Sequence, residues 1–141
     1  MTTIQEDVVN IYRNRKTGEF RIQPFARATH SSQPFGEQTA IKAQDAATTL
    51  LKSVLQNLSK NTSQKYVKEL MPRISDEEFR RSLAEDQLVS VVRSQGKYRI
   101  MPFKKMGKSM GSVDELEVSV SEEKFLQRGM DLIEEAFSHL L

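Results

Sequence analysis

The sequence predicts an α+β fold in which two ββ(β)α repeats form an antiparallel sheet, with helices packed on one face and a short connecting helix between the repeats. Three observations lead to this prediction: a segment that occurs twice, a β-branched run before each copy, and an amphipathic helical stretch after each copy. We expect a single domain, residues 1–141, built from two pseudo-repeats at about 8–59 and 88–141 that are joined by a connector at 60–87.

The repeated segment is Gly-Glu-Phe-Arg-Ile-Gln-Pro-Phe at residues 18–25 and Gly-Lys-Tyr-Arg-Ile-Met-Pro-Phe at residues 96–103, an offset of 78 (96 minus 18). Gly, Arg, Ile, Pro and Phe are identical in the two copies, and the exchange of Phe for Tyr keeps an aromatic side chain at the same place. The offset continues downstream, where Leu51 falls opposite Gly129. The two halves therefore look like one unit used twice.

Each unit begins with a predicted β-hairpin. The first strands are the β-branched, apolar runs Val8–Tyr12 and Leu88–Val92, and each leads into a polar turn that contains glycine. In the return strands, at 19–23 and 97–101, apolar side chains alternate with arginine. This alternation predicts one apolar face and one basic face.

A proline follows each return strand. We expect Pro24 and Pro102 to end the strand pairing, because proline lacks the N–H group that a ladder needs. After the prolines, the sequence predicts two loops (26–38 and 104–114) and then two short strands (39–43 and 116–120).

Each unit ends in a predicted helix. In the first unit, leucine and valine recur at helical spacing over Asp45–Ser59. In the second, Ser121 is a suitable N-cap, and Glu122 and Glu123 are favourably placed at the positive end of the helix. A capping-box pattern in the connector predicts a further short helix over residues 75–85.

The composition excludes several classes of function. The chain has no cysteine and only two scattered histidines, so a thiolate nucleophile, a zinc ribbon and a His-rich metal site lack their usual ligands. No apolar run approaches the roughly 20 residues needed to cross a bilayer, and the N-terminus lacks the features of a secretory signal. No group of residues indicates catalysis. We therefore expect a cytoplasmic, non-enzymatic protein with no metal, no cofactor and no membrane contact.

Charge is distributed unevenly, although the formal net charge is only +2. Residues 88–112 contain six basic side chains and no acid, whereas residues 113–141 contain eight acids against Lys124 and Arg128. The predicted hairpins are thus basic and the C-terminal region is acidic. Such a polar molecule is suited to steering a charged macromolecule.

The basic hairpins suggest one kind of partner. In a nucleic-acid platform, phosphates would be bound by Arg13, Arg21, Lys97 and Arg99, while aromatic residues stack on bases: Tyr12, Tyr98, Phe25 and Phe103. The competing interpretation is that Phe20, Ile22, Tyr98 and Ile100 form the core and that the arginines lie on a solvated sheet face.

The order of features also resembles a known family. The second half has a strand, a glycine turn, a strand ending in proline, a glycine-bearing loop and a serine-initiated helix ending in Ala136-Phe137; the segment Ser75-Asp-Glu-Glu-Phe79 precedes it. This pattern resembles the contact-dependent growth inhibition immunity proteins, most visibly from about Ser75 to Phe137. The resemblance implies a small, cytoplasmic, non-catalytic bacterial protein that binds and neutralises the toxic C-terminal domain of a cognate effector.

The charge of the toxin decides which surface would meet it. Inhibitors of nucleases are commonly acidic, whereas this chain has an isoelectric point of about 8.9. For a basic toxin the acidic region must supply the contact, and we expect the contacting residues to be Asp114, Glu115, Glu117, Glu122 and Glu123. For an acidic toxin, the arginine-bearing hairpins replace them.

Overall fold

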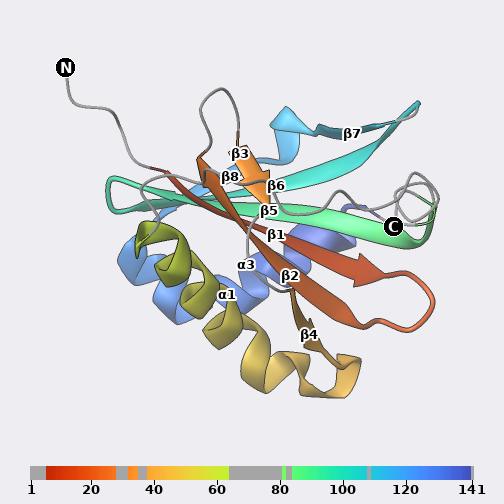
Figure 1. Cartoon of the computed structure of the whole chain (residues 1–141), viewed down its shortest axis with the longest axis horizontal. Helices are drawn as coiled ribbons and strands as arrows, with labels where there is room; N and C mark the ends of the chain where they lie inside the picture. Colours follow the sequence, from red (N-terminus) through yellow and green to blue (C-terminus); the bar gives the residue numbers. More distant parts are fainter. Residues whose placement is uncertain are drawn as a thin grey trace.

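The computed structural model describes residues 6–27, 32–34, 38–63, 81, 84–107 and 109–140. These residues form an eight-stranded antiparallel sheet with two helices on one of its faces (Figure 1). The predicted α+β class is therefore confirmed.

The described residues of the first half form four strands, a 3-10 turn and a helix. Its elements are β1 (Asp7–Asn14), β2 (Phe20–Arg27), β3 (Ser32–Pro34), β4 (Thr39–Ile41), η1 (Ala43–Asp45) and α1 (Ala46–Ser63). The second half contains elements of the same kinds. They are β5 (Asp86–Ser94), β6 (Lys97–Met106), β7 (Ser109–Ser112), η2 (Asp114–Leu116), β8 (Val118–Ser121) and α3 (Glu122–Ser138).

One continuous sheet runs through both halves. Its strand order is β3-β2-β1-β5-β6-β7, with β4 also paired to β2 and β8 also paired to β6. The two halves join through the antiparallel pair of β1 and β5, in which Asp7 lies opposite Arg93 and Asn14 lies opposite Asp86. Because these central strands run in opposite directions, the turns of the β1–β2 and β5–β6 hairpins lie at opposite ends of the sheet.

The two hairpins pair in the same register. Val8 lies opposite Phe25 in the first, and Leu88 lies opposite Phe103 in the second. Their turns differ in length, because residues 15–19 connect the first pair of strands whereas Gln95 and Gly96 suffice for the second. Gln95 and Gly96 both have positive φ, the conformation that a two-residue hairpin turn requires.

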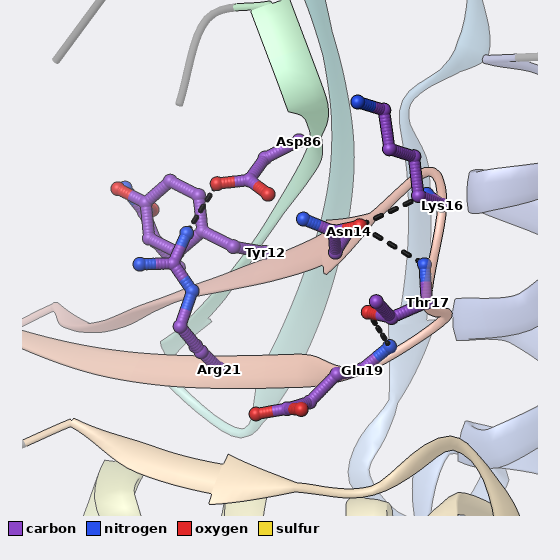
Figure 2. Close-up of polar contacts among 8 residues, drawn as sticks. Tyr12, Asn14, Lys16, Thr17, Glu19, Arg21 and Asp86 are labelled. Atoms are coloured by element: carbon purple, nitrogen blue, oxygen red, sulfur yellow. Dashed lines mark hydrogen bonds and ion pairs between the residues drawn. The ribbon is translucent and has the colours of Figure 1, made fainter. Parts of the chain in front are cut away.

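Side-chain hydrogen bonds hold the longer turn. Asn14 Oδ1 accepts from the backbone N–H groups of Lys16 and Thr17, at 2.9 and 3.0 Å, and Thr17 Oγ1 accepts from the N–H of Glu19 at 3.2 Å (Figure 2). These bonds replace ladder hydrogen bonds that the longer chain segment cannot make. Lys16 and Glu19 are exposed, so this stabilisation requires no burial of charge.

The prediction that proline ends each return strand is wrong. Pro24 pairs with Val9 and Pro102 pairs with Val89, and both strands continue beyond them. The partner strands explain why. On the outer side of β6, β8 pairs with residues 97–100 and β7 with residues 103–106, so Pro102 lies at the break between the two partners, where a ladder donor is not needed. Pro24 lies at the same break between β4 and β3.

The predicted loops therefore contain further strands. Residues 104–106 and 109–112 form the β6–β7 hairpin, and residues 32–34 pair with the end of β2 as β3. The short strands after the loops are confirmed in shortened or shifted form, as β4 and β8.

The core lies between the sheet and the two helices (Figure 1). Alternate residues of the four long strands are buried on this face: Val9, Ile11, Phe20, Ile22, Val89, Val91, Tyr98 and Ile100. From the helices, Leu50, Val54 and Leu58 of α1 and Phe125, Ile133 and Phe137 of α3 fill the layer. The predicted core interpretation of Phe20, Ile22, Tyr98 and Ile100 is thus confirmed.

Helix α1 begins one residue after its predicted start and ends at Ser63, four residues beyond its predicted end, and α3 begins directly after the predicted cap. Ser121 caps α3, since its hydroxyl accepts from the N–H of Lys124 at 3.3 Å. The connecting helix predicted at 75–85 lies mostly outside the described residues. Within the described part of the chain, no helix is long and apolar enough to cross a membrane.

Candidate partner-binding surfaces

The five predicted acidic contact residues follow one another along the outer edge of the second half. We call Asp114, Glu115, Glu117, Glu122 and Glu123 the acidic strip, and all five side chains are exposed. The first two lie in η2, Glu117 precedes β8, and the last two form the start of α3. Since the four residues of β8 separate Glu117 from Glu122, the two groups lie about 16 Å apart along the strand.

Local structure fixes the backbone of the acidic strip. The Ser112 hydroxyl donates to Asp114 Oδ1 at 3.0 Å, and the N–H of Glu117 donates to the carbonyl of Asp114 at 3.2 Å. At the other end, the N–H of Glu122 donates to the carbonyl of Gly96 in the β5–β6 turn at 3.2 Å. Glu122 and Glu123 also lie in the first turn of α3, where negative charge is favourable.

Only one acid of the strip is engaged by a cation among the described residues. Glu117 Oε1 accepts from Arg99 Nη1 at 3.4 Å, and this arginine also donates to Glu6 Oε2 at 2.8 Å. The other four carboxylates face solvent without an ion pair to the described part of the chain. Within the described residues, four carboxylates of the strip thus have no ion pair, and a basic partner would complement them.

The four predicted basic contact residues do not share one surface. Lys97 and Arg99 of β6, and Arg21 of β2, alternate with core residues and lie on the sheet face opposite the helices. Arg13 of β1 lies on the helix side, because it pairs with Phe20, a core residue. Moreover, β2 and β6 are three strand spacings apart, or about 14 Å, so Arg21 and Arg99 form two separate points of charge.

Arg21 already has partners within the chain. Its guanidinium makes an ion pair with the buried carboxylate of Asp86 and lies over the Tyr12 ring, 5.2 Å from the centroid (Figure 2). Burial raises the pKa of Tyr12, and its hydrogen bond with Asn10 opposes that shift. The tyrosine therefore stays neutral beside the arginine. The guanidinium of the ion pair packs against the face of its ring.

Arg13 is also engaged. Its Nε donates to Gln87 Oε1 at 2.8 Å, and its guanidinium lies 4.6 Å from the centroid of the Phe137 ring in α3. Burial lowers the pKa of Arg13, and the nearby Glu134 carboxylate opposes that shift. Arg13 thus joins the sheet to the end of α3.

The aromatic residues predicted to stack on bases are placed differently from one another. Tyr98 is buried beneath α3 and stacks on Phe125, with ring centroids 4.2 Å apart, so it is not accessible to a base. Tyr12, Phe25 and Phe103 are half-buried on the opposite sheet face. The arrangement of Tyr98 removes one of the four stacking positions that the nucleic-acid hypothesis used.

The acidic partners of Arg21 and Arg99 were not predicted from the sequence. Glu6 directly precedes β1 and binds Arg99, and Asp86 is the first residue of β5 and binds Arg21. The signal was present, because Glu6 precedes Val8 by the same two residues by which Asp86 precedes Leu88. Within the described residues, no cluster of three or more potential metal ligands occurs.

Comparison with known proteins identifies the fold. No family model matches the sequence, and no curated protein matches it. A Neisseria meningitidis protein of unknown function, NMB0488, superposes with a TM-score of 0.74 over 100% of this chain and 99% of that chain, at 14% sequence identity. A chain of the CdiA-CT/CdiI toxin and immunity complex from Yersinia pseudotuberculosis superposes with a TM-score of 0.67 over 99% of this chain and 100% of that chain, at 11% identity. The protein therefore has the fold of a component of a toxin and immunity complex.

Proposed function

We propose that this protein is an immunity protein that binds and neutralises the toxic C-terminal domain of a cognate contact-dependent growth inhibition effector. The observation that carries the proposal is the superposition on a chain of the CdiA-CT/CdiI complex over nearly the whole length of both chains. The order of strands, turns and helices in the sequence supports the same family. In this proposal the protein acts in the cytoplasm, by occupying the toxin and without catalysing a reaction.

We further propose that the acidic strip contacts the toxin. Four of its five carboxylates have no ion-pair partner in the described part of the chain, whereas Arg21 and Arg99 pair with Asp86 and Glu6, and Arg13 is held by the neutral side chains of Gln87 and Phe137. A surface whose charges are uncompensated gains more from a complementary partner than one whose charges are already paired. The toxin surface that fits the strip is therefore basic, as on a domain that binds nucleic acid.

Co-expression with the C-terminal domain of the effector encoded immediately upstream tests the proposal. Rescue of host growth together with a stable one-to-one complex is the expected result. If cells die and nothing co-purifies, this pairing is wrong. Salt-dependent binding of the isolated protein to oligonucleotides would then favour the nucleic-acid-binding alternative.

A matched pair of double variants tests the contact surface. Glu115→Gln with Glu122→Gln removes two charges from the acidic strip, while Glu134→Gln with Glu135→Gln removes two exposed charges from the far end of α3. We expect the first pair to slow association with the toxin by about tenfold at low salt and the control pair to have little effect. Equal association rates for the two double variants would exclude the acidic strip as the contact.

A further inference from the structure

The two halves meet along a seam that has approximate two-fold symmetry. We define the seam as the β1–β5 ladder together with the contact between α1 and α3. Asn10 lies opposite Ser90 in this ladder, and the Ser90 hydroxyl donates to Asn10 Oδ1 at 2.5 Å. The two residues also hold matching positions in their hairpins, since Asn10 pairs with Gln23 and Ser90 with Met101, which are 78 residues apart. Equivalent residues contact each other only on a two-fold axis.

The helix layer has its own contact between equivalent residues. A Cβ atom on Gly129 of α3 would lie 2.7 Å from Leu51 Cδ1 of α1, so the leucine side chain fills the place that glycine leaves empty. Leu51 and Gly129 are related by the same offset of 78 that relates the two hairpins. The axis therefore passes through the sheet at Asn10–Ser90 and between the helices at Leu51–Gly129.

Away from the axis, the contacts that cross the seam occur in reciprocal pairs. On the helix side, Arg13 Nε donates to Gln87 Oε1 at 2.8 Å, and Arg93 Nε donates to Asp7 Oδ2 at 3.0 Å. In hairpin register, Arg93 matches Arg13, because Arg93 pairs with Tyr98 as Arg13 pairs with Phe20. Each arginine thus reaches across to the start of the other half's central strand.

The same two arginines also reach the other half's helix. Arg13 lies over the Phe137 ring near the end of α3, and Arg93 Nη2 donates to the carbonyl of Leu58 in α1 at 3.2 Å. Burial lowers the pKa of Arg93, but hydrogen bonds with Tyr98 and Asp7 outweigh that effect and raise the pKa. Each arginine thus contacts the helix of the other half, Arg13 through an aromatic ring and Arg93 through a backbone carbonyl.

A second reciprocal pair lies on the opposite sheet face. Arg21 of the first half binds Asp86 of the second, and Arg99 of the second half binds Glu6 of the first. Arg21 and Arg99 are 78 residues apart, and their partners lie at matching positions, since Glu6 precedes Val8 and Asp86 precedes Leu88 by the same two residues. Together with the axis contacts, this is the pattern of an isologous interface, in which residue i contacts residue j and the equivalent of j contacts the equivalent of i.

We propose that the chain is a fused two-fold dimer, in which the seam is a complete interface that holds two half-chains together without the connector. The partner that this surface fits is a second unit of the same ββ(β)α kind. The inference does not depend on a toxin and goes beyond the proposed function. It implies that the contacts across the seam, between residues 6–63 and residues 84–140, hold the folded chain together.

Cutting the connector of the full chain tests the proposal. A protease recognition sequence is inserted between residues 70 and 71, the purified protein is cut to completion, and the products are followed by size-exclusion chromatography and circular dichroism. We expect the two fragments to co-elute at the mass of the intact chain and to keep its spectrum at micromolar concentration. Fragments that separate, unfold or aggregate on cutting would overturn the proposal.

Exchange of the axis residues tests the symmetry itself. Gly129→Leu alone overpacks the helix contact and Leu51→Gly alone opens a cavity, so we expect each to weaken fragment association by about tenfold or more. The double variant Leu51→Gly with Gly129→Leu returns one leucine and one glycine to the axis, and we expect it to recover most of the native affinity. Leu126→Gly is the control for the effect of introducing a glycine into a helix, because Leu126 is an exposed residue of α3. We expect this variant to leave the affinity of the fragments nearly unchanged. A double variant as weak as the product of the singles would refute the equivalence.

Discussion

The outer edges of the two halves have the same architecture and opposite charge. In each half a short strand pairs with the return strand of the hairpin and a helix then packs on the sheet: β4 and α1 in the first, β8 and α3 in the second. Residues 38–63 contain Lys42, Lys52 and Lys60 against the single acid Asp45, whereas residues 113–140 contain eight acids and two basic residues.

This difference in charge shows which positions of the two edges the fold constrains and which it does not. Both edges keep a buried apolar residue where the short strand meets the core, Ile41 in β4 and Val120 in β8. Their exposed positions have no such constraint, since a charged side chain there stays in water with either sign. The acid excess of the second half is therefore not required by the architecture, and this supports placing the proposed partner contact on the acidic strip.

Phe20 and Tyr98 are the core aromatic residues at equivalent positions of the two halves. Replacing them should give the largest change in the free energy of unfolding. Phe20 contacts Phe137 edge-on, with ring centroids 5.6 Å apart, and Tyr98 stacks on Phe125. We expect Phe20→Ala and Tyr98→Ala each to lower the free energy of unfolding by about 3–5 kcal/mol, because each opens a cavity beneath α3. Urea denaturation measures both. A loss below about 1 kcal/mol in one half only would mean that the halves do not share one core.

The reciprocal ion pairs give a smaller and unequal effect. The Asp86 side chain is 7% exposed and that of its partner Arg21 is 37% exposed, whereas Arg99 and Glu6 are 40% and 47% exposed. We expect Arg21→Ala to cost about 1–3 kcal/mol, because it removes a cation from a buried carboxylate, and Arg99→Ala to cost less than about 1 kcal/mol.

Salt distinguishes the two pairs further. Added sodium chloride should diminish the effect of Arg99→Ala, since exposed charges are screened, and should change that of Arg21→Ala much less. Lys97→Ala is the matched control, because this lysine lies two residues from Arg99 on the same strand and face. Equal losses for Arg21→Ala and Arg99→Ala at all salt concentrations would contradict the assigned difference in burial.

The sequence predicted the architecture where periodicity and turn chemistry act locally. Alternation placed Phe20 and Tyr98 in the core, and the serine at 121 marked the start of α3. The same reasoning failed at Pro24 and Pro102, because whether a missing N–H matters depends on the neighbouring strands. Those strands come from distant parts of the chain, and the break between β8 and β7 has no local signal.

For the candidate site, sequence reasoning identified charges but not their partners. The acidic strip could be named from composition, whereas the ion pairs of Arg21 with Asp86 and Arg99 with Glu6 depend on the β1–β5 register. Register is set by long-range packing of both halves, so one sequence could not show that these arginines are already engaged. The partner surface remains a prediction for the same reason, since it depends on a second molecule.

The smallest expected effect concerns a position at which the halves differ in chemistry. Tyr12 pairs with Arg21 in the first hairpin, and Val92 pairs with Arg99 at the matching position of the second. Burial raises the pKa of Tyr12 above its unfolded value near 10. Above that pH the unfolded chain loses the phenolic proton before the folded chain does, so stability falls as pH rises through the unfolded pKa towards the folded one.

Tyr12→Phe should remove this part of the alkaline loss. At pH 7 the variant gives up only the hydrogen bond from Asn10, and we expect its free energy of unfolding to fall by about 1 kcal/mol or less. Between pH 9 and pH 11 the difference from the native protein should shrink or reverse, because phenylalanine has no proton to lose. If the free energies of unfolding of Tyr12→Phe and the native protein changed in parallel with pH, the Tyr12 ring beneath Arg21 would be open to water. Tyr12 and the matching Val92 would then differ in side-chain size alone.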